Sequence, residues 1–150
     1  MITKEDERWM RQAILEAEAA GAEGEVPVGA VIVSRNRIVG RGHNMTEALK
    51  DVPAHAAIMA ITAAANTLGG KYLPDCTIYV TVEPCMMCAG ALGWCQIGRI
   101  VYGTPDVKRG FLSYFGNDPS PLHPKTIVDS GLLADDCAAL MSDFFKLRRK

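Results

Sequence analysis

The stretch CTIYVTVEPCMMCAGALGW, residues 76–94, decides the fold because its pattern changes within a few residues. Residues 76–82 are mostly apolar and β-branched, which predicts a buried strand. Helical spacing of apolar residues begins after Pro84, and proline suits the start of a helix. A strand that leads directly into a helix is the repeating unit of an α/β fold.

The other predicted elements continue this alternation along the chain. The predicted helices cover residues 3–20, 53–68, 85–94 and 132–150, and the predicted strands cover residues 28–33, 38–40, 76–82 and 99–103. Strand 28–33 is almost entirely apolar, which predicts helices on both faces of the sheet. Residues 104–124 are rich in proline, and so long a loop in a small domain is often functional. We predict one α/β domain over residues 1–150 with a partly parallel sheet.

The composition is that of a globular protein without a long apolar or basic segment. Of the 150 residues, 49% are hydrophobic and 22% are charged, and the formal net charge is -1. Residues 1–10 contain no apolar leader, and no stretch approaches the roughly 18 apolar residues of a membrane span. We expect a cytoplasmic protein with no membrane contact. Any RNA binding must therefore be local, and the only notable basic clusters are Lys108 with Arg109 and residues 146–150. These cations equally fit a solvated helix end that complements the helix dipole.

Three side chains predict a metal site. The helix at 53–68 begins VPAHAAIMAI (52–61), which indicates burial almost all round, yet His55 stands in its first turn. A buried imidazole without a partner costs about 1–3 kcal/mol. Cys85 and Cys88 lie three residues apart at the start of the next helix, where thiolates are stabilised and both sulfur atoms project from one side. One imidazole and two thiolates predict a catalytic type of zinc site, whose fourth position stays open for water.

Other interpretations of these residues remain open. A Cys-x-x-Cys pair also occurs in redox sites and in half of many zinc knuckles. His55 also fits a core histidine with a protein partner, beside cysteines that are merely buried. The remaining cysteines, Cys76, Cys95 and Cys137, have no such spacing, so we expect them to be structural.

Several motifs together point to one family. They are GEVPVGAV (24–31), GHN (42–44), PAHA (53–56), EPCMMCAGA (83–91), RIVYG (99–103), DVKRG (106–110) and GLLADDCAALMSDFF (131–145). Over nearly its full length the chain resembles bacterial tRNA adenosine deaminases, whose zinc signature is H-x-E followed by P-C-x-x-C. The resemblance implies a three-layer α/β/α cytidine-deaminase-like fold with a central mixed sheet of about five strands. It also implies a homodimer.

The resemblance implies a reaction as well. In this family, zinc activates a water molecule that attacks C6 of the wobble adenosine in the tRNA anticodon loop, and ammonia leaves to give inosine. His55, Cys85 and Cys88 match the ligands of one Zn²⁺ per subunit. Ala57 holds the position of the glutamate that shuttles the proton. We therefore predict that this chain folds, binds zinc and is nearly inactive. An engineered substitution explains a single change in an intact motif more simply than a natural pseudoenzyme does.

The resemblance also assigns contacts with the target nucleotide. Asn44 holds the base or its ribose, the backbone around Ala56 contacts the base, and Val28 with Pro27 forms the pocket wall. Asp106 matches a position that contacts the neighbouring sugar, where a carboxylate can accept from a 2′-hydroxyl. Asn44 and Asp106 also fit ordinary turn residues.

The closing helix is expected to contact RNA near its end. Phe145 or Phe144 can stack on a base, and Arg149 or Arg148 can bind a phosphate. The spacing of the two phenylalanines equally allows them to be core residues.

Two rival functions follow from the same motifs. One is a zinc deaminase of the same fold that acts on a free base or nucleoside such as guanine or cytosine. The other is a noncatalytic RNA-binding protein that has kept the fold without the chemistry, which Ala57 permits. The isoelectric point of about 6.3 fits the first rival slightly better than RNA binding, whereas the basic and aromatic closing helix and DVKRG (106–110) favour tRNA.

Overall fold

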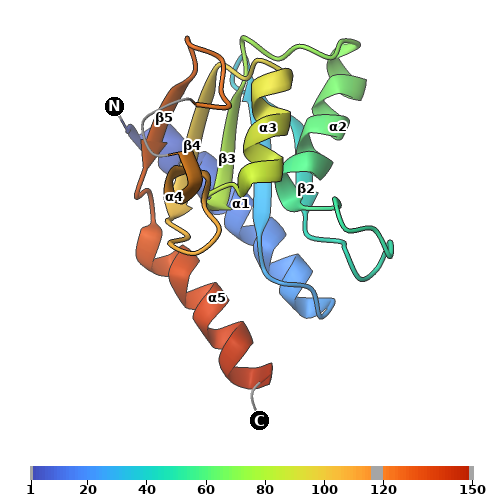
Figure 1. Ribbon diagram of the computed structural model, residues 1–150, viewed down its shortest axis with the longest axis vertical. Helices are drawn as coiled ribbons and strands as arrows, with labels where there is room; N and C mark the ends of the chain where they lie inside the picture. Colours follow the sequence, from blue (N-terminus) through green and yellow to red (C-terminus); the bar gives the residue numbers. More distant parts are fainter. Residues whose placement is uncertain (1, 116–119, 149–150) are drawn as a thin grey trace.

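The computed structural model describes residues 2–115 and 120–148. They form a central five-stranded sheet with helices packed against it (Figure 1). The strands are β1 (Gly29–Ser34), β2 (Arg37–His43), β3 (Thr77–Val82), β4 (Arg99–Thr104) and β5 (Ile127–Ser130). Their order in the sheet is β2-β1-β3-β4-β5. β1 is antiparallel to β2 and β3, whereas β3, β4 and β5 are parallel to one another, so the sheet is mixed as predicted.

Helices cover both faces of this sheet. They are α1 (Lys4–Ala22), α2 (Ala56–Leu68), α3 (Met86–Trp94), α4 (Phe111–Phe115) and α5 (Ala134–Arg148). Figure 1 shows α2 and α3 in front of the sheet and α1 behind it. One apolar core includes Ala60 of α2 and Leu92 of α3, and a second includes Met10 of α1 and Cys137 of α5. Two cores on opposite faces of one sheet confirm the predicted three-layer α/β/α fold. None of the described helices is long and apolar enough to cross a membrane.

β1 is buried on both faces, as its apolar sequence predicts. Ile32 belongs to the core under α2 and α3, whereas its neighbours Val31 and Val33 belong to the core under α1. The strand alternation therefore divides one apolar run between two cores. The hairpin from β1 to β2 turns at Arg35 and Asn36, whose φ angles of 51° and 61° are those of the tight turn that suits twisted strands.

The start of α2 differs from the prediction. The helix begins at Ala56, and His55 is its N-cap residue with φ −78° and ψ 154°. Proline at position 53 starts no helix here, since residues 53–55 lie outside the helix. Burial almost all round is also wrong, because only the face toward the sheet is fully buried. The buried residues of α2 are Ala56, Ala57, Ala60 and Ala64.

Three further differences lie in the C-terminal half. The loop predicted at 104–124 contains α4, and the four-residue strand β5 follows it. β5 is mostly exposed at the edge of the sheet, so it lacks the apolar alternation by which strands are recognised. The closing helix begins at Ala134 because Leu133 has a left-handed φ of 52°, which a helix does not allow. Arg149, a predicted RNA contact, lies outside the described residues.

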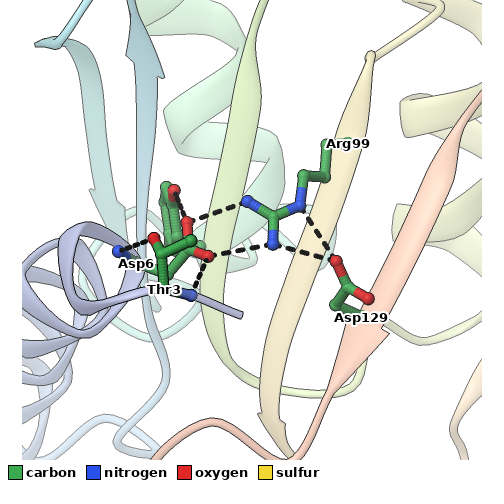
Figure 2. Close-up of polar contacts among 5 residues, drawn as sticks. Thr3, Asp6, Arg99 and Asp129 are labelled. Atoms are coloured by element: carbon green, nitrogen blue, oxygen red, sulfur yellow. Dashed lines mark hydrogen bonds and ion pairs between the residues drawn. The ribbon is translucent and has the colours of Figure 1, made fainter. Parts of the chain in front are cut away.

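A charge network around the buried Asp6 lies at the end of the sheet at which β3 and β4 begin (Figure 2). Arg99 donates to both carboxylate oxygens of Asp6, at 2.8 and 3.0 Å, and its Nε donates to Asp129 at 3.0 Å. Burial raises the pKa of Asp6, but hydrogen bonds from Arg99, Tyr79 and Thr3 outweigh burial and hold that pKa well below its usual range. The stabilisation from Asp6 is therefore present above the unfolded-state pKa of about 3.9 and is lost as the pH falls through the depressed folded-state pKa.

Tyr79→Phe is expected to destabilise the protein by about 1.5–3 kcal/mol, the usual worth of a hydrogen bond to a charged group. The Tyr79 hydroxyl donates to Asp6 Oδ1 at 2.6 Å, and the side chain is buried. Urea unfolding measures the loss. Tyr114→Phe, at a position that is 59% exposed, is the matched control and should change nothing. Equal stability of Tyr79→Phe and the parent chain would contradict this account.

His43 at the end of β2 predicts a pH-dependent contribution to stability. Burial lowers the pKa of His43, but Glu16 at 3.0 Å from Nδ1 and Glu23 at 3.3 Å from Nε2 outweigh burial and raise it. The contribution is therefore complete below the unfolded-state pKa of about 6.5 and is lost as the pH rises through the raised folded-state pKa. His43→Gln should cost more stability at about pH 5.5 than at about pH 9 in urea unfolding. A cost independent of pH would refute this.

Candidate active site

The three predicted metal ligands meet at one end of the sheet, where β3 ends. His55 directly precedes α2, and Cys85 directly precedes α3. His55 Nδ1 lies 3.6 Å from Cys85 Sγ and 3.5 Å from Cys88 Sγ. The three donor atoms all lie within 4.8 Å of one another, close enough to bind one ion. His55 is thus brought to Cys85 and Cys88, which follow it by 30 and 33 positions in the chain, because α2 and α3 begin beside each other.

The local backbone leaves these side chains available. Both N-cap residues, His55 and Cys85, have extended backbones, and neither side chain caps its own helix. Cys88 lies one turn into α3 and is 3% exposed, whereas His55 and Cys85 are half-buried. The cluster therefore has one buried ligand and two that are accessible from the end of the sheet.

The charge state of the cluster suits a cation. Hydrogen bonding with the Cys88 and His55 side chains lowers the pKa of Cys85 to about 4, although burial acts in the opposite direction. The neighbouring Cys85 and burial raise the pKa of Cys88, so its thiol keeps its proton while Cys85 is a thiolate. The Cys85 sulfur raises the pKa of His55 against burial. A metal must therefore displace the proton of Cys88 when it binds, and it needs His55 in its neutral form, as is usual for such ligands.

The donor set fits zinc. Two sulfur atoms and one imidazole nitrogen are ligands that zinc prefers, and a set of three leaves the fourth tetrahedral position free. Within residues 2–115 and 120–148, this is the only group of three or more suitable donors, and no carboxylate belongs to it. Ala57, predicted from the sequence to hold the position of the missing acid, is 3% exposed in the first turn of α2 and presents only a methyl group.

Val28, Asn44 and Ala56, three of the predicted substrate contacts, lie at the same end of the sheet. The Asn44 backbone N–H donates to the Val28 carbonyl at 3.2 Å, and the Met45 N–H donates to the Ala54 carbonyl at 3.0 Å. β2 packs so closely on α2 that a Cβ at Gly42 would lie 2.4 Å from the Ala56 carbonyl oxygen. The structure therefore brings the C-terminal end of β2 and the start of α2 together. Asn44 directly follows β2 and is 9% exposed.

Asp106 acts as a turn residue in the structure. Its Oδ1 accepts from the backbone N–H groups of Lys108 at 3.1 Å and Arg109 at 3.0 Å. These hydrogen bonds are those expected from the alternative interpretation of Asp106 as an ordinary turn residue. Its contact with a sugar stays a prediction.

The end of α5 lies beside the loops at the end of α1. The Arg148 guanidinium stacks over Phe144 at 4.7 Å and donates to the Gly24 carbonyl at 2.5 Å. Phe145 is 43% exposed, so it is not a core residue, and its ring meets Phe144 edge to face at 5.4 Å. A cavity of about 550 Å³ is lined by these three α5 residues together with Glu23, Gly24, Glu25, Val26, Thr46 and Glu47.

Two buried glutamates near the site were missed in the sequence. Glu25 is 2% exposed, and its carboxylate accepts from the N–H groups of Glu47 and Ala48 at 3.1 and 2.8 Å. Glu83 is 6% exposed and holds a second loop. The available signal was an acid within an apolar run, in EVPV and in TVEPC. Burial of a lone acid requires hydrogen-bond donors, which here come from the backbone.

Residues 3–104 match the family described as the cytidine and deoxycytidylate deaminase zinc-binding region. The fold and the site thus define a zinc-binding deaminase domain. A tRNA-specific adenosine deaminase from Agrobacterium fabrum is 40% identical over 144 residues, which cover 94% of each chain. The chain belongs to the tRNA-specific adenosine deaminases of this family.

Two further comparisons agree. A structure from a study of A-to-I editing by tRNA:A34 deaminases at the wobble position superimposes with a TM-score of 0.83 and 40% identity, over 89% of this chain and 98% of that chain. A chloroplastic tRNA(adenine(34)) deaminase from Arabidopsis thaliana is 39% identical over 161 residues. The match covers 95% of this chain but spans only 12% of that protein's length.

Proposed function

We propose that residues 1–150 form a single deaminase domain built to convert the wobble adenosine of a tRNA anticodon loop to inosine, with release of ammonia. The observation that carries this proposal is the convergence of His55, Cys85 and Cys88 in a chain that belongs to the tRNA deaminases. We also propose that Ala57 leaves the chain nearly inactive. Free thiols at all five cysteines favour a reducing compartment such as the cytoplasm.

The residues of this chain divide the work of the reaction. His55, Cys85 and Cys88 hold one Zn²⁺, which when bound supplies Lewis-acid activation of a water molecule. Asn44 orients the base or its ribose, and the backbone of Ala56 and the side chain of Val28 form the pocket around the adenine.

The proton transfers need a carboxylic acid. A carboxylate two residues after His55 can take the proton from the attacking water and pass it to the adenine. The methyl group of Ala57 can do neither, so binding is retained while turnover is lost.

RNA supplies a base that can enter such a site. Nucleobases in a duplex are stacked, whereas those of an anticodon loop can be extruded and read along an edge. Phe145 is proposed to stack on a flanking base, which its exposure near the end of α5 supports, and Arg149 is proposed to bind a phosphate. Asp106 is proposed to accept from a 2′-hydroxyl.

A second copy of the chain is proposed to cover the outer face of α3. Met86, Met87 and Trp94 are 46%, 37% and 85% exposed, and a side chain added at Gly90 would meet nothing within 4 Å. Adjacent exposed apolar residues on one helix are typical of an interface. Sedimentation should give the mass of a dimer for the parent chain and that of a monomer for Trp94→Arg. A monomeric parent chain would remove this proposal.

A substrate comparison tests the function. The Ala57→Glu variant should deaminate an anticodon stem-loop with a higher kcat/KM than free adenosine, guanine or cytosine. A higher kcat/KM on guanine or cytosine would favour the free-base deaminase instead. Tight binding of the stem-loop without turnover, at full zinc content, would favour the noncatalytic RNA-binding protein that Ala57 permits.

A further inference from the structure

Glu83 is a buried carboxylate that holds a loop from the polypeptide backbone. It follows β3 directly, and its side chain is 6% exposed. Oε1 accepts from the Asp106 N–H at 3.1 Å, and Oε2 accepts from the Leu112 N–H at 3.0 Å. Among the described residues no cation pairs with this carboxylate, so Oε1 holds the loop at Asp106 and Oε2 holds the first turn of α4, into which that loop leads.

The loop that Glu83 holds comprises residues 105–110, between β4 and α4, and is called the basic loop below. It lies against the metal ligands, because Gly110 forms a backbone bridge with Cys85, and the adjoining Phe111 N–H donates to the Pro84 carbonyl at 2.9 Å. A Cβ at Gly110 would lie 2.3 Å from the Glu83 carboxylate. Only glycine therefore lets the loop approach the carboxylate this closely.

The basic loop carries exposed cations beside the metal site. Lys108 and Arg109 are both exposed, and their backbone N–H groups are fixed by Asp106 Oδ1. Neither side chain has a hydrogen-bond or ion-pair partner within residues 2–115 and 120–148. The chain as a whole has a net charge of -1, so it does not attract a polyanion strongly. A local pair of unpaired cations beside the site would attract the phosphates of RNA there.

We propose that Glu83 is a positioning residue for RNA, which fixes the basic loop so that Lys108 and Arg109 meet phosphates beside the target nucleotide. This inference rests on the proposed tRNA substrate. A loop ordered before binding loses little conformational freedom when RNA docks, whereas a loose loop must be ordered at that moment. In Glu83→Gln one of the two carboxylate oxygens is replaced by an NH₂ group, which cannot accept from a backbone N–H, so one of these two hydrogen bonds is lost.

Binding to the chain as it stands tests this proposal, because Ala57 should allow binding without turnover. Fluorescence anisotropy with a fluorescein-labelled anticodon stem-loop gives Kd. Glu83→Gln and Gly110→Ala should each raise Kd by about tenfold, and the double variant should raise it little further, since both release the same loop. Lys108→Ala should reduce the slope of log Kd against log salt by about 1 in the parent chain, but by clearly less in Glu83→Gln.

A matched control separates positioning from general stability. Asp6→Asn removes a hydrogen-bonded carboxylate that is 3% exposed at the opposite end of the sheet, so it should lower the Tm and leave Kd unchanged. The visible spectrum of cobalt-loaded protein should be the same for Glu83→Gln and the parent chain, because the ligands are unchanged. Should Glu83→Gln not fold, Gly110→Ala with Lys108→Ala provides the same test.

Three results would overturn the inference, and they do so in two different ways. If the parent chain binds the stem-loop and both Glu83→Gln and Gly110→Ala bind it equally well, Glu83 is only structural, whereas the proposed substrate survives. An unchanged salt slope in Lys108→Ala leads to the same conclusion. If the parent chain with zinc bound does not bind the stem-loop at all, the proposed substrate fails, and the inference fails with it.

Discussion

Ala57→Glu is expected to raise the rate of adenosine deamination in an anticodon stem-loop by at least about 10²-fold, and by up to about 10⁴-fold. General acid and base catalysis contributes about 10² to 10⁴ in rate, and here one side chain performs both steps. No carboxylate among the described residues belongs to the metal cluster, and position 57 offers only a methyl group. Inosine formation under single-turnover conditions measures the effect without interference from product release.

The matched control for this prediction is Ala57→Gln, which has nearly the same size and hydrogen-bonding reach as the glutamate variant but cannot transfer the proton. It should bind zinc and stay inactive. If Ala57→Glu also stays inactive while its zinc content and stem-loop affinity are intact, the missing carboxylate does not explain the inactivity.

Cys88→Ala should weaken zinc binding by well over about 10²-fold. Loss of a residue that merely supports a metal ligand typically costs 10- to 100-fold in affinity, and loss of a ligand itself costs more. Cys88 is the most buried of the three ligands, and no fourth donor among the described residues belongs to the cluster. Competition with a chromophoric chelator measures the affinity.

Cys95→Ala is the control for Cys88→Ala. Cys95 is also buried, at 6% exposed, and its Sγ donates to the Leu92 carbonyl at 3.4 Å instead of facing the cluster. This variant should bind zinc as the parent chain does. Equal zinc affinity of Cys88→Ala and Cys95→Ala would show that Cys88 is no ligand.

The pair of cysteines and the layered fold were predictable because both depend on local patterns. The spacing of Cys85 and Cys88 places both sulfur atoms at one helix start, and the apolar run of β1 requires cover on both faces. What brings His55 to the cysteines is tertiary packing. The sequence indicated that His55 would meet the cysteines only through the resemblance to the tRNA adenosine deaminases and because a buried imidazole needs a partner.

The features that were missed depend on contacts distant in the chain or on exposed segments. The carboxylate of Glu83 accepts from the backbone N–H groups of Asp106 and Leu112, which are more than 20 residues away. No local sequence pattern predicts such partners. β5 gains its place by pairing with β4 at an exposed edge, where burial does not impose alternation. His55 was expected inside a helix because proline at 53 suits a helix start, yet the helix begins after the ligand.

X-ray absorption at the zinc edge, combined with elemental analysis, tests the central claim most directly. The account predicts one zinc per folded chain, bound by two sulfur atoms, one imidazole nitrogen and one further oxygen atom from solvent. Cys85→Ala and Cys88→Ala should each reduce the number of sulfur atoms bound to zinc from two to one. A folded parent chain that takes up no zinc, or that binds it through four protein ligands, would contradict the account.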